Sequence, residues 1–136
     1  MATVNVIEYV TIASLGNATD FGDLTASTDK HGACSDGTKC TVAGGTVATY
    51  TDTIQYFNIA STGNAADFGD LTTGTGYCPG VISDGTKGVI GGGRVSPGSN
   101  VNTIEYWVMA SLGNASDFGD LTESQHGVGG TSGDTS

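Results

Sequence analysis

The chain has 136 residues, of which 37% are hydrophobic and 13% charged, so it has room for one domain with a modest core and is too short for a multi-domain enzyme. Fourteen acidic and four basic residues give a net charge of −10, which would repel phosphate backbones and anionic membranes. We therefore expect neither nucleic acid nor a membrane as a partner. Glycine accounts for 23 residues and proline for 2, which favours tight turns over long helices.

A 19-residue block occurs three times along the chain. Residues 7–25 read IEYVTIASLGNATDFGDLT, residues 54–72 read IQYFNIASTGNAADFGDLT, and residues 104–122 read IEYWVMASLGNASDFGDLT. Thirteen of the 19 positions are identical in all three copies, which start 47 and then 50 residues apart. A unit of about 50 residues has the length of a propeller-type blade, so we treat residues 1–136 as a single β-repeat domain.

The start of each block predicts a strand with apolar side chains on both faces. In the first block, Ile7 and Tyr9 lie on one face of the strand, and Val10 and Ile12 lie on the other. Such a strand must be covered on both sides, as when sheets are stacked. The residues that we expect in the core or in an assembly interface are Ile7, Tyr9, Ile54, Tyr56, Phe57, Ile104, Tyr106 and Trp107.

A second repeated element, SDGTK, lies between the blocks at residues 35–39 and 83–87, and a glycine pair follows it each time. The Asp-Gly dipeptides predict hairpin turns, because glycine tolerates the positive φ that a tight hairpin needs. Each unit then supplies a hairpin, a Gly-Gly exit and a third strand. The GNAxDFGDL end of each block has turn chemistry at both ends, with one Phe and one Leu to pin it to the core.

The first hairpin also carries two cysteines. Cys34 and Cys40 flank Gly37 symmetrically, so they could form a disulfide if the strand register centres on that glycine. Cys78 would then remain unpaired, and the alternative is that all three thiols are free. A zinc site is not indicated, because the cysteines and histidines lack paired ligand spacing.

Asparagine and aspartate recur at fixed positions in the three blocks, as in Asn17, Asp20 and Asp23. Hard oxygen ligands on a turn suit Ca²⁺, although the pattern is shorter than an EF-hand loop and lacks its terminal glutamate. The alternative is that these side chains make local turn contacts. The candidate calcium ligands are Asp20, Asp23, Asp67, Asp70, Asp117 and Asp120. We expect no cofactor, with calcium as the alternative, and no enzymatic activity, since no residue is marked as a nucleophile.

The order strand, Gly-Gly, loop and Ile-Glu-Tyr strand resembles the kelch repeat of β-propellers. The block ending in GNAxDFGDLT is similar to the tandem kelch-like repeats in structural proteins of tailed phages, cyanophages in particular. The resemblance implies an all-β fold of propeller-blade or β-prism type and a place in the virion, as a tail fibre, appendage or capsid decoration. It also implies copies of itself and other virion proteins as partners. The alternative is a secreted or surface module that binds glycan or calcium and is extracellular.

The segments outside the blocks suggest how copies could assemble. No hairpin precedes the first block, and residues 123–136 form a partial repeat or a flexible tail in which Gln125-His126-Gly127 echoes Lys30-His31-Gly32. We expect the strand at residues 6–12 to pair with the tail of a neighbouring copy, because open strand edges invite pairing with another chain. The alternative is a closed three-unit prism within one chain.

Overall fold

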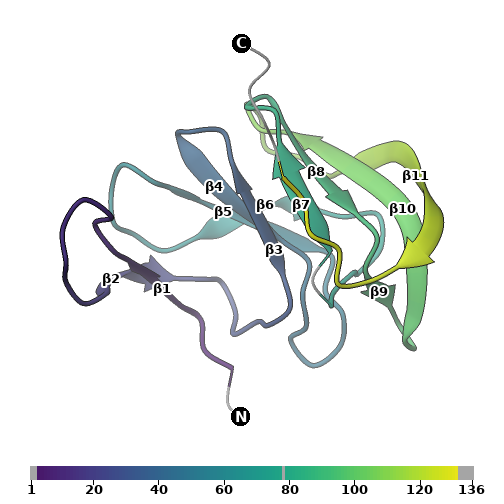
Figure 1. The fold of residues 1–136 in the computed structure, drawn as a ribbon, viewed down its shortest axis with the longest axis horizontal. Coiled ribbons are helices and arrows are strands. Elements are labelled where there is room, and N and C mark those ends of the chain that lie inside the picture. The colour runs from purple at the N-terminus through teal and green to yellow at the C-terminus, as the bar shows by residue number, and fades with distance from the viewer. Residues whose placement is uncertain (1–2, 78, 132–136) are drawn as a thin grey trace.

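The structure is a computed structural model that describes residues 3–77 and 79–131. It has eleven β-strands in three antiparallel sheets, and the described residues contain no helix (Figure 1). The prediction of an all-β fold is confirmed. Accordingly, the described part of the chain contains no helix that could span a membrane.

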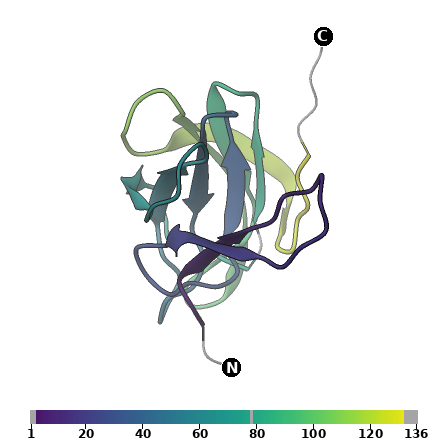
Figure 2. The same cartoon turned by 90° about the vertical axis from the view of Figure 1, so that its left-hand side faces the viewer.

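The first sheet is a two-stranded hairpin made by the first block together with Val6. It pairs β1 (Val6–Tyr9) with β2 (Thr19–Asp23) in antiparallel fashion. This sheet lies at one end of the long axis of the molecule and faces the viewer in Figure 2.

The second sheet has four antiparallel strands, and the third sheet repeats this arrangement with a short fifth strand added. The second sheet has the order β3-β4-β5-β6, with bounds Gly32–Ser35, Lys39–Ala43, Thr53–Asn58 and Ala66–Asp70. The third sheet has the order β7-β8-β10-β11, with bounds Gly80–Ser83, Lys87–Gly91, Ser99–Val108 and Ser116–Gln125, and the short β9 (Arg94–Val95) also pairs with β10. The predicted hairpins β3-β4 and β7-β8 are confirmed.

The DFGD segment of each block forms a strand, which the sequence analysis took as part of a turn. These strands are β2, β6 and β11, and each pairs with the Ile-x-Tyr strand of its own block. The register shifts by one residue in each pair, opposite a glycine whose φ is +151° at Gly22 and +152° at Gly69. A β-bulge with glycine at this φ lets an Asp- and Gly-rich segment remain a strand.

The main core lies between the second and third sheets. It contains the buried side chains of Ala43, Ile54, Phe68, Leu71, Ile90, Trp107, Met109 and Ala115. The indole of Trp107 lies over Gly88, where an added Cβ would be 2.3 Å from the ring. The equivalent pair in the second sheet is Cys40 opposite Phe57, so a smaller aromatic ring is accompanied by a larger neighbour.

The three sheets are arranged as an open row. The first sheet and the strands β10 and β11 lie at opposite ends of the molecule in Figure 1, and the described residues form no closed barrel or ring. Each end of the row therefore presents one sheet face that no further sheet covers.

The core predicts a large effect for one substitution. Trp107→Ala should lower the free energy of unfolding by about 3–5 kcal/mol, because it removes a large side chain that is 1% exposed between two sheets. Urea denaturation would measure the change. Val108→Ala, at the adjacent 44% exposed position, is the matched control and should change stability by less than about 1 kcal/mol. Equal effects of the two variants would contradict this account of the core.

Candidate functional site

Successive sheets are connected by a contact that occurs twice with the same atoms, and we call it the joint. Its backbone part is a pair of hydrogen bonds between blocks. In the first joint, the N–H groups of Gly63 and Ala65 donate to the carbonyl oxygens of Phe21 and Asp23, at 2.8 and 2.7 Å. In the second joint, the N–H groups of Gly113 and Ala115 donate in the same way to Phe68 and Asp70, at 2.9 and 2.8 Å.

An asparagine side chain adds a third hydrogen bond to each joint. Asn64 Oδ1 accepts from the N–H of Asp23 at 3.0 Å, and Asn114 Oδ1 accepts from the N–H of Asp70 at 3.1 Å. The asparagine of one block therefore binds the backbone of the preceding block. These asparagines were expected in a turn or at a calcium site, so this role is new, although their identical spacing in the three blocks was a usable signal.

A buried polar side chain completes the polar part of the joint. Gln55 Oε1 accepts from the N–H and the hydroxyl of Thr25, at 2.7 and 2.9 Å. Glu105 accepts from the same two groups of Thr72, at 2.7 and 2.8 Å, with one carboxylate oxygen for each. Both acceptors belong to residues that are 4% exposed. Burial of such groups is tolerated only when they are hydrogen-bonded, so this contact fixes how the two sheets align.

Apolar side chains fill the rest of the joint. We call the face of each sheet that carries the block's Ile, Tyr, Phe and Leu side chains its back face, and the opposite face its front face. In the second joint, Ile54, Phe68 and Leu71 of the back face are 0%, 2% and 4% exposed, and they pack against Trp107 and Met109 of the next front face. In the first joint, the ring of Phe21 lies 5.3 Å from that of Phe57.

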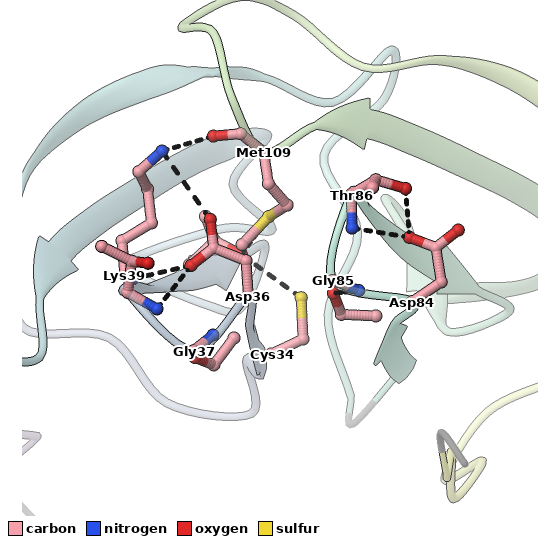
Figure 3. A network of polar contacts seen from close by, with 12 residues as sticks. Cys34, Asp36, Gly37, Lys39, Asp84, Gly85, Thr86 and Met109 are labelled. Atoms are coloured by element: carbon pink, nitrogen blue, oxygen red, sulfur yellow. Dashed lines mark hydrogen bonds and ion pairs between the residues drawn. The ribbon is translucent and has the colours of Figure 1, made fainter. Parts of the chain in front are cut away.

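The two SDGTK turns also contribute to the second joint, as Figure 3 shows. Lys39 Nζ donates to the carbonyl oxygen of Met109, whose N–H donates to Thr86 O at 2.8 Å. Met109 thus bridges the turn of the second sheet and the turn of the third. Within the turns, Asp36 Oδ1 accepts from the N–H of Lys39 at 2.8 Å, and Asp84 Oδ1 accepts from the N–H of Lys87 at 2.7 Å.

These bonds change the acidity of the turn aspartates. The hydroxyl of Thr86 and the backbone N–H groups of Lys87 and Thr86 lower the pKa of Asp84 to about 2. Partial burial acts to raise the pKa of Asp36, but its backbone hydrogen bonds outweigh this effect and lower the pKa. Both carboxylates are therefore ionised well below neutral pH and serve as acceptors for their own turns.

The candidate calcium ligands do not converge. They lie on β2, β6 and β11, and among the described residues no group of three or more His, Cys, Asp or Glu side chains is placed to hold a metal ion. Asn64 and Asn114 are already engaged between blocks. The six aspartates therefore lie on the outer strands of three different sheets.

Cys34 and Cys40 do not face each other across the hairpin. Cys34 pairs with Thr41, and Cys40 pairs with Ser35, because the turn centres between Gly37 and Thr38 and not on Gly37. Both thiols are free, and Cys34 Sγ lies 3.3 Å from Thr41 Oγ1. Burial raises the pKa of Cys40 to about 11, and Cys34 adds to the effect, so this thiol stays protonated at neutral pH. Cys78 lies outside the described residues.

A cluster of side chains surrounds Tyr77 on the loops. Lys30 Nζ lies 4.2 Å and Arg94 Cζ lies 5.1 Å from the centre of the Tyr77 ring, and the rings of Tyr50 and His126 lie 6.1 and 6.0 Å from it. The other histidine, His31, is half-buried, and burial lowers its pKa although Asp29 opposes the shift.

Comparison with models of known protein families gives no match. Comparison with curated protein sequences gives no significant relative either.

The joint predicts different effects for equivalent asparagines. Asn64→Ala should lower the free energy of unfolding by about 1 kcal/mol, because it leaves the N–H of Asp23 without its acceptor. Asn17→Ala is the matched control, since Asn17 is exposed in the connection between β1 and β2, and it should leave stability unchanged. Urea denaturation at submicromolar concentration would test this, and equal losses in the two variants would contradict the joint.

The acidity of Asp84 predicts a pH dependence. Its pKa is lowered from 3.8 to about 2, so the stability that it contributes is present above pH 4 and is lost as the pH falls through 2. The difference in unfolding free energy between the wild type and Asp84→Asn should therefore shrink between pH 4 and pH 2. Urea titrations across this range would measure it, and a difference that does not change with pH would refute the assignment.

Proposed function

We propose that this chain is a non-enzymatic structural protein, a building block of a phage virion that assembles with copies of itself through β-strand complementation. In this proposal the second and third sheets are kelch-like blades, and the first sheet is the outer half of another blade. Tail fibre, appendage and capsid decoration are the candidate positions, with other virion proteins as further partners. The resemblance of the repeated block to phage structural repeats supports the virion assignment.

The observation that carries the proposal is the open edge of β1. In the second and third sheets, the strand that corresponds to β1 has a neighbour on each side, β4 and β6 for β5, and β8 and β11 for β10. Within the described residues, β1 pairs with β2 alone. Unpaired backbone groups at a strand edge favour the addition of a further strand.

An apolar cavity of about 540 Å³ lies beside this edge. Its walls include Val6 and Ile7 of the first sheet and Val42 and Phe57 of the second. In the second joint, the corresponding space between the sheets holds the packed strands β3 and β7, where an added Cβ at Gly32 would be 2.2 Å from Val81. The cavity therefore has the place, between sheets, that an inner strand would fill.

The segment after β11 supports the same reading. Gly130 lies against β7, since an added Cβ would be 2.6 Å from Ile82 and 3.1 Å from the carbonyl oxygen of Val81. Val128 packs beside Gly80 and Gly92. This segment thus occupies, on the back of the third sheet, the position that the inner strand of a following blade would take, and we propose that it supplies the missing neighbour of β1 in another copy.

The Tyr77 cluster favours a second candidate function, an extracellular module that binds glycan. Two of the four basic residues of the chain flank this ring, and an adjoining cavity of about 310 Å³ is lined by Tyr50 and Tyr77. Aromatic rings with cations beside them suit a sugar that carries a carboxylate. Binding of an acidic oligosaccharide by a stable monomer, lost in Tyr77→Ala, would support this alternative.

The proposed function predicts regular homo-oligomers. At about 100 μM, sedimentation velocity and negative-stain microscopy should show assemblies larger than a monomer, and EDTA should change neither the assemblies nor the melting temperature. A monodisperse monomer would overturn the proposed assembly. A fall of more than about 10 °C in melting temperature with EDTA would instead establish a structural cation.

A further inference from the structure

The two ends of the row of sheets present the two halves of the joint. The back face of the third sheet repeats the back faces that are covered in the first and second sheets. The front face of the first sheet repeats the front faces that cover them.

The back face of the third sheet is an apolar surface that no further sheet covers, and only the segment around Val128 and Gly130 packs along its β7 side. Phe118 is 60% exposed, whereas its counterpart Phe68 is 2% exposed. Ile104 and Leu121 are half-buried beside it, and their counterparts in the second sheet are buried in the core. A cavity of about 270 Å³ lies on this face, between side chains of the sheet that include Ile104, Phe118 and Leu121 and the segment 128–130 that follows β11.

The front face of the first sheet also lacks a partner, because no back face covers it. The predicted strand over residues 6–12 ends at Tyr9, so Val10 and Ile12 lie in the connection that continues from this face. They are 57% and 98% exposed, and their counterparts Trp107 and Met109 are each 1% exposed. Ala18 is likewise exposed, whereas its counterpart Ala115 is buried. The apolar side chains that close a joint are thus present at this end without a back face to receive them.

The polar groups of the joint are also present at the two ends. The first block holds Glu8 and Asn17 at the positions of Glu105 and Asn114, and the third block holds Asp120 and Thr122 at the positions of Asp70 and Thr72. At Gly22 and Gly69 an added Cβ would be 2.3 and 2.4 Å from the carbonyl oxygen of the next block. At Gly119 nothing lies within 4 Å, so the space for that approach is free.

We propose that the back face of the third sheet of one copy docks on the front face of the first sheet of a second copy, through the same joint that connects the sheets within one chain. In this contact Asn17 accepts from the N–H of Asp120, and Glu8 accepts from Thr122. The inference deepens the proposed self-assembly and rests on it. The occupant is a second copy, because the first block of this chain carries the residues that cover the same back-face groups in the closed joints.

The contact is head-to-tail and leaves one free half-joint at each end. Such a heterologous contact closes into a ring if its rotation allows and otherwise continues as a filament. It also brings β1 of the second copy to the segment that follows β11 of the first, so strand complementation and the joint form together. Lys87, the counterpart of Lys39, would then face the carbonyl oxygen of Ile12.

Two charge substitutions separate the halves of the contact. Ile12→Asp disables the front face and Phe118→Asp disables the back face, and each variant alone should sediment as a monomer. An equimolar mixture should form a 1:1 dimer and nothing larger, because each variant retains the half that the other lacks. Val47→Asp, at a 51% exposed loop position outside both faces, is the matched control and should assemble like the wild type.

Folding and function are checked separately. The melting temperatures of the dilute variants should match that of the control, and Asn17→Ala, a milder change, should weaken assembly roughly fivefold. If the wild type assembles while Ile12→Asp and Phe118→Asp assemble equally well, the joint is wrong and the proposed function stands. A dimer of either single variant, or a mixture that remains monomeric, would also overturn the head-to-tail joint. A monomeric wild type would instead overturn the proposed function.

Discussion

The close approach between the backbone of one block and the next is the contact on which the arrangement depends. The N–H of Gly63 reaches the carbonyl oxygen of Phe21 only because Gly22, beside it, has no side chain. The same holds for Gly113, Phe68 and Gly69 in the second joint. A methyl group at either bulge glycine would push the sheets apart, which would open the apolar layer and leave the buried glutamine or glutamate without its threonine partner.

The differences among the three blocks also follow from the joint. The back-face residues Ile, Tyr, Phe and Leu are the same in every block, whereas the front-face positions hold Val10, Phe57 or Trp107. The space that the larger ring needs comes from the neighbouring strand, where Gly88 replaces the Cys40 that lies opposite Phe57. The back face stays the same from block to block. Each front face fits it because a larger aromatic side chain on one strand is paired with a smaller residue on the neighbouring strand.

Local sequence chemistry predicted part of this structure. Alternating apolar residues and Asp-Gly turns were sufficient for the Ile-x-Tyr strands and for both hairpins, because these features depend on neighbouring residues. The strand at Ala66–Asp70 was missed, since Asp and Gly are typical of turns and only its pairing with β5 across a bulge makes it a strand. The hairpin register was left open, because it depends on Asp36, which accepts two backbone N–H groups in a turn centred between Gly37 and Thr38.

The hydrogen bonds of Asn64 and Gln55 could not be predicted from local sequence patterns. Their hydrogen bonds are made to the preceding block, 41 and 30 residues away in the chain, so no neighbouring residue indicates them. What the sequence did contain was their recurrence at one spacing. A polar residue repeated without a local partner is a reason to look for its partner in the next repeat.

The constancy of the back faces has a consequence for how the blocks recognise one another. A given front face meets nearly the same chemistry on its own chain and on any neighbouring chain, so affinity alone cannot select the correct order of sheets. The linkers between blocks provide that selection, because a short tether gives an effective concentration on the order of millimolar. At micromolar protein, docking within the chain is then favoured by roughly a thousandfold, and the order of the sheets is set by connectivity.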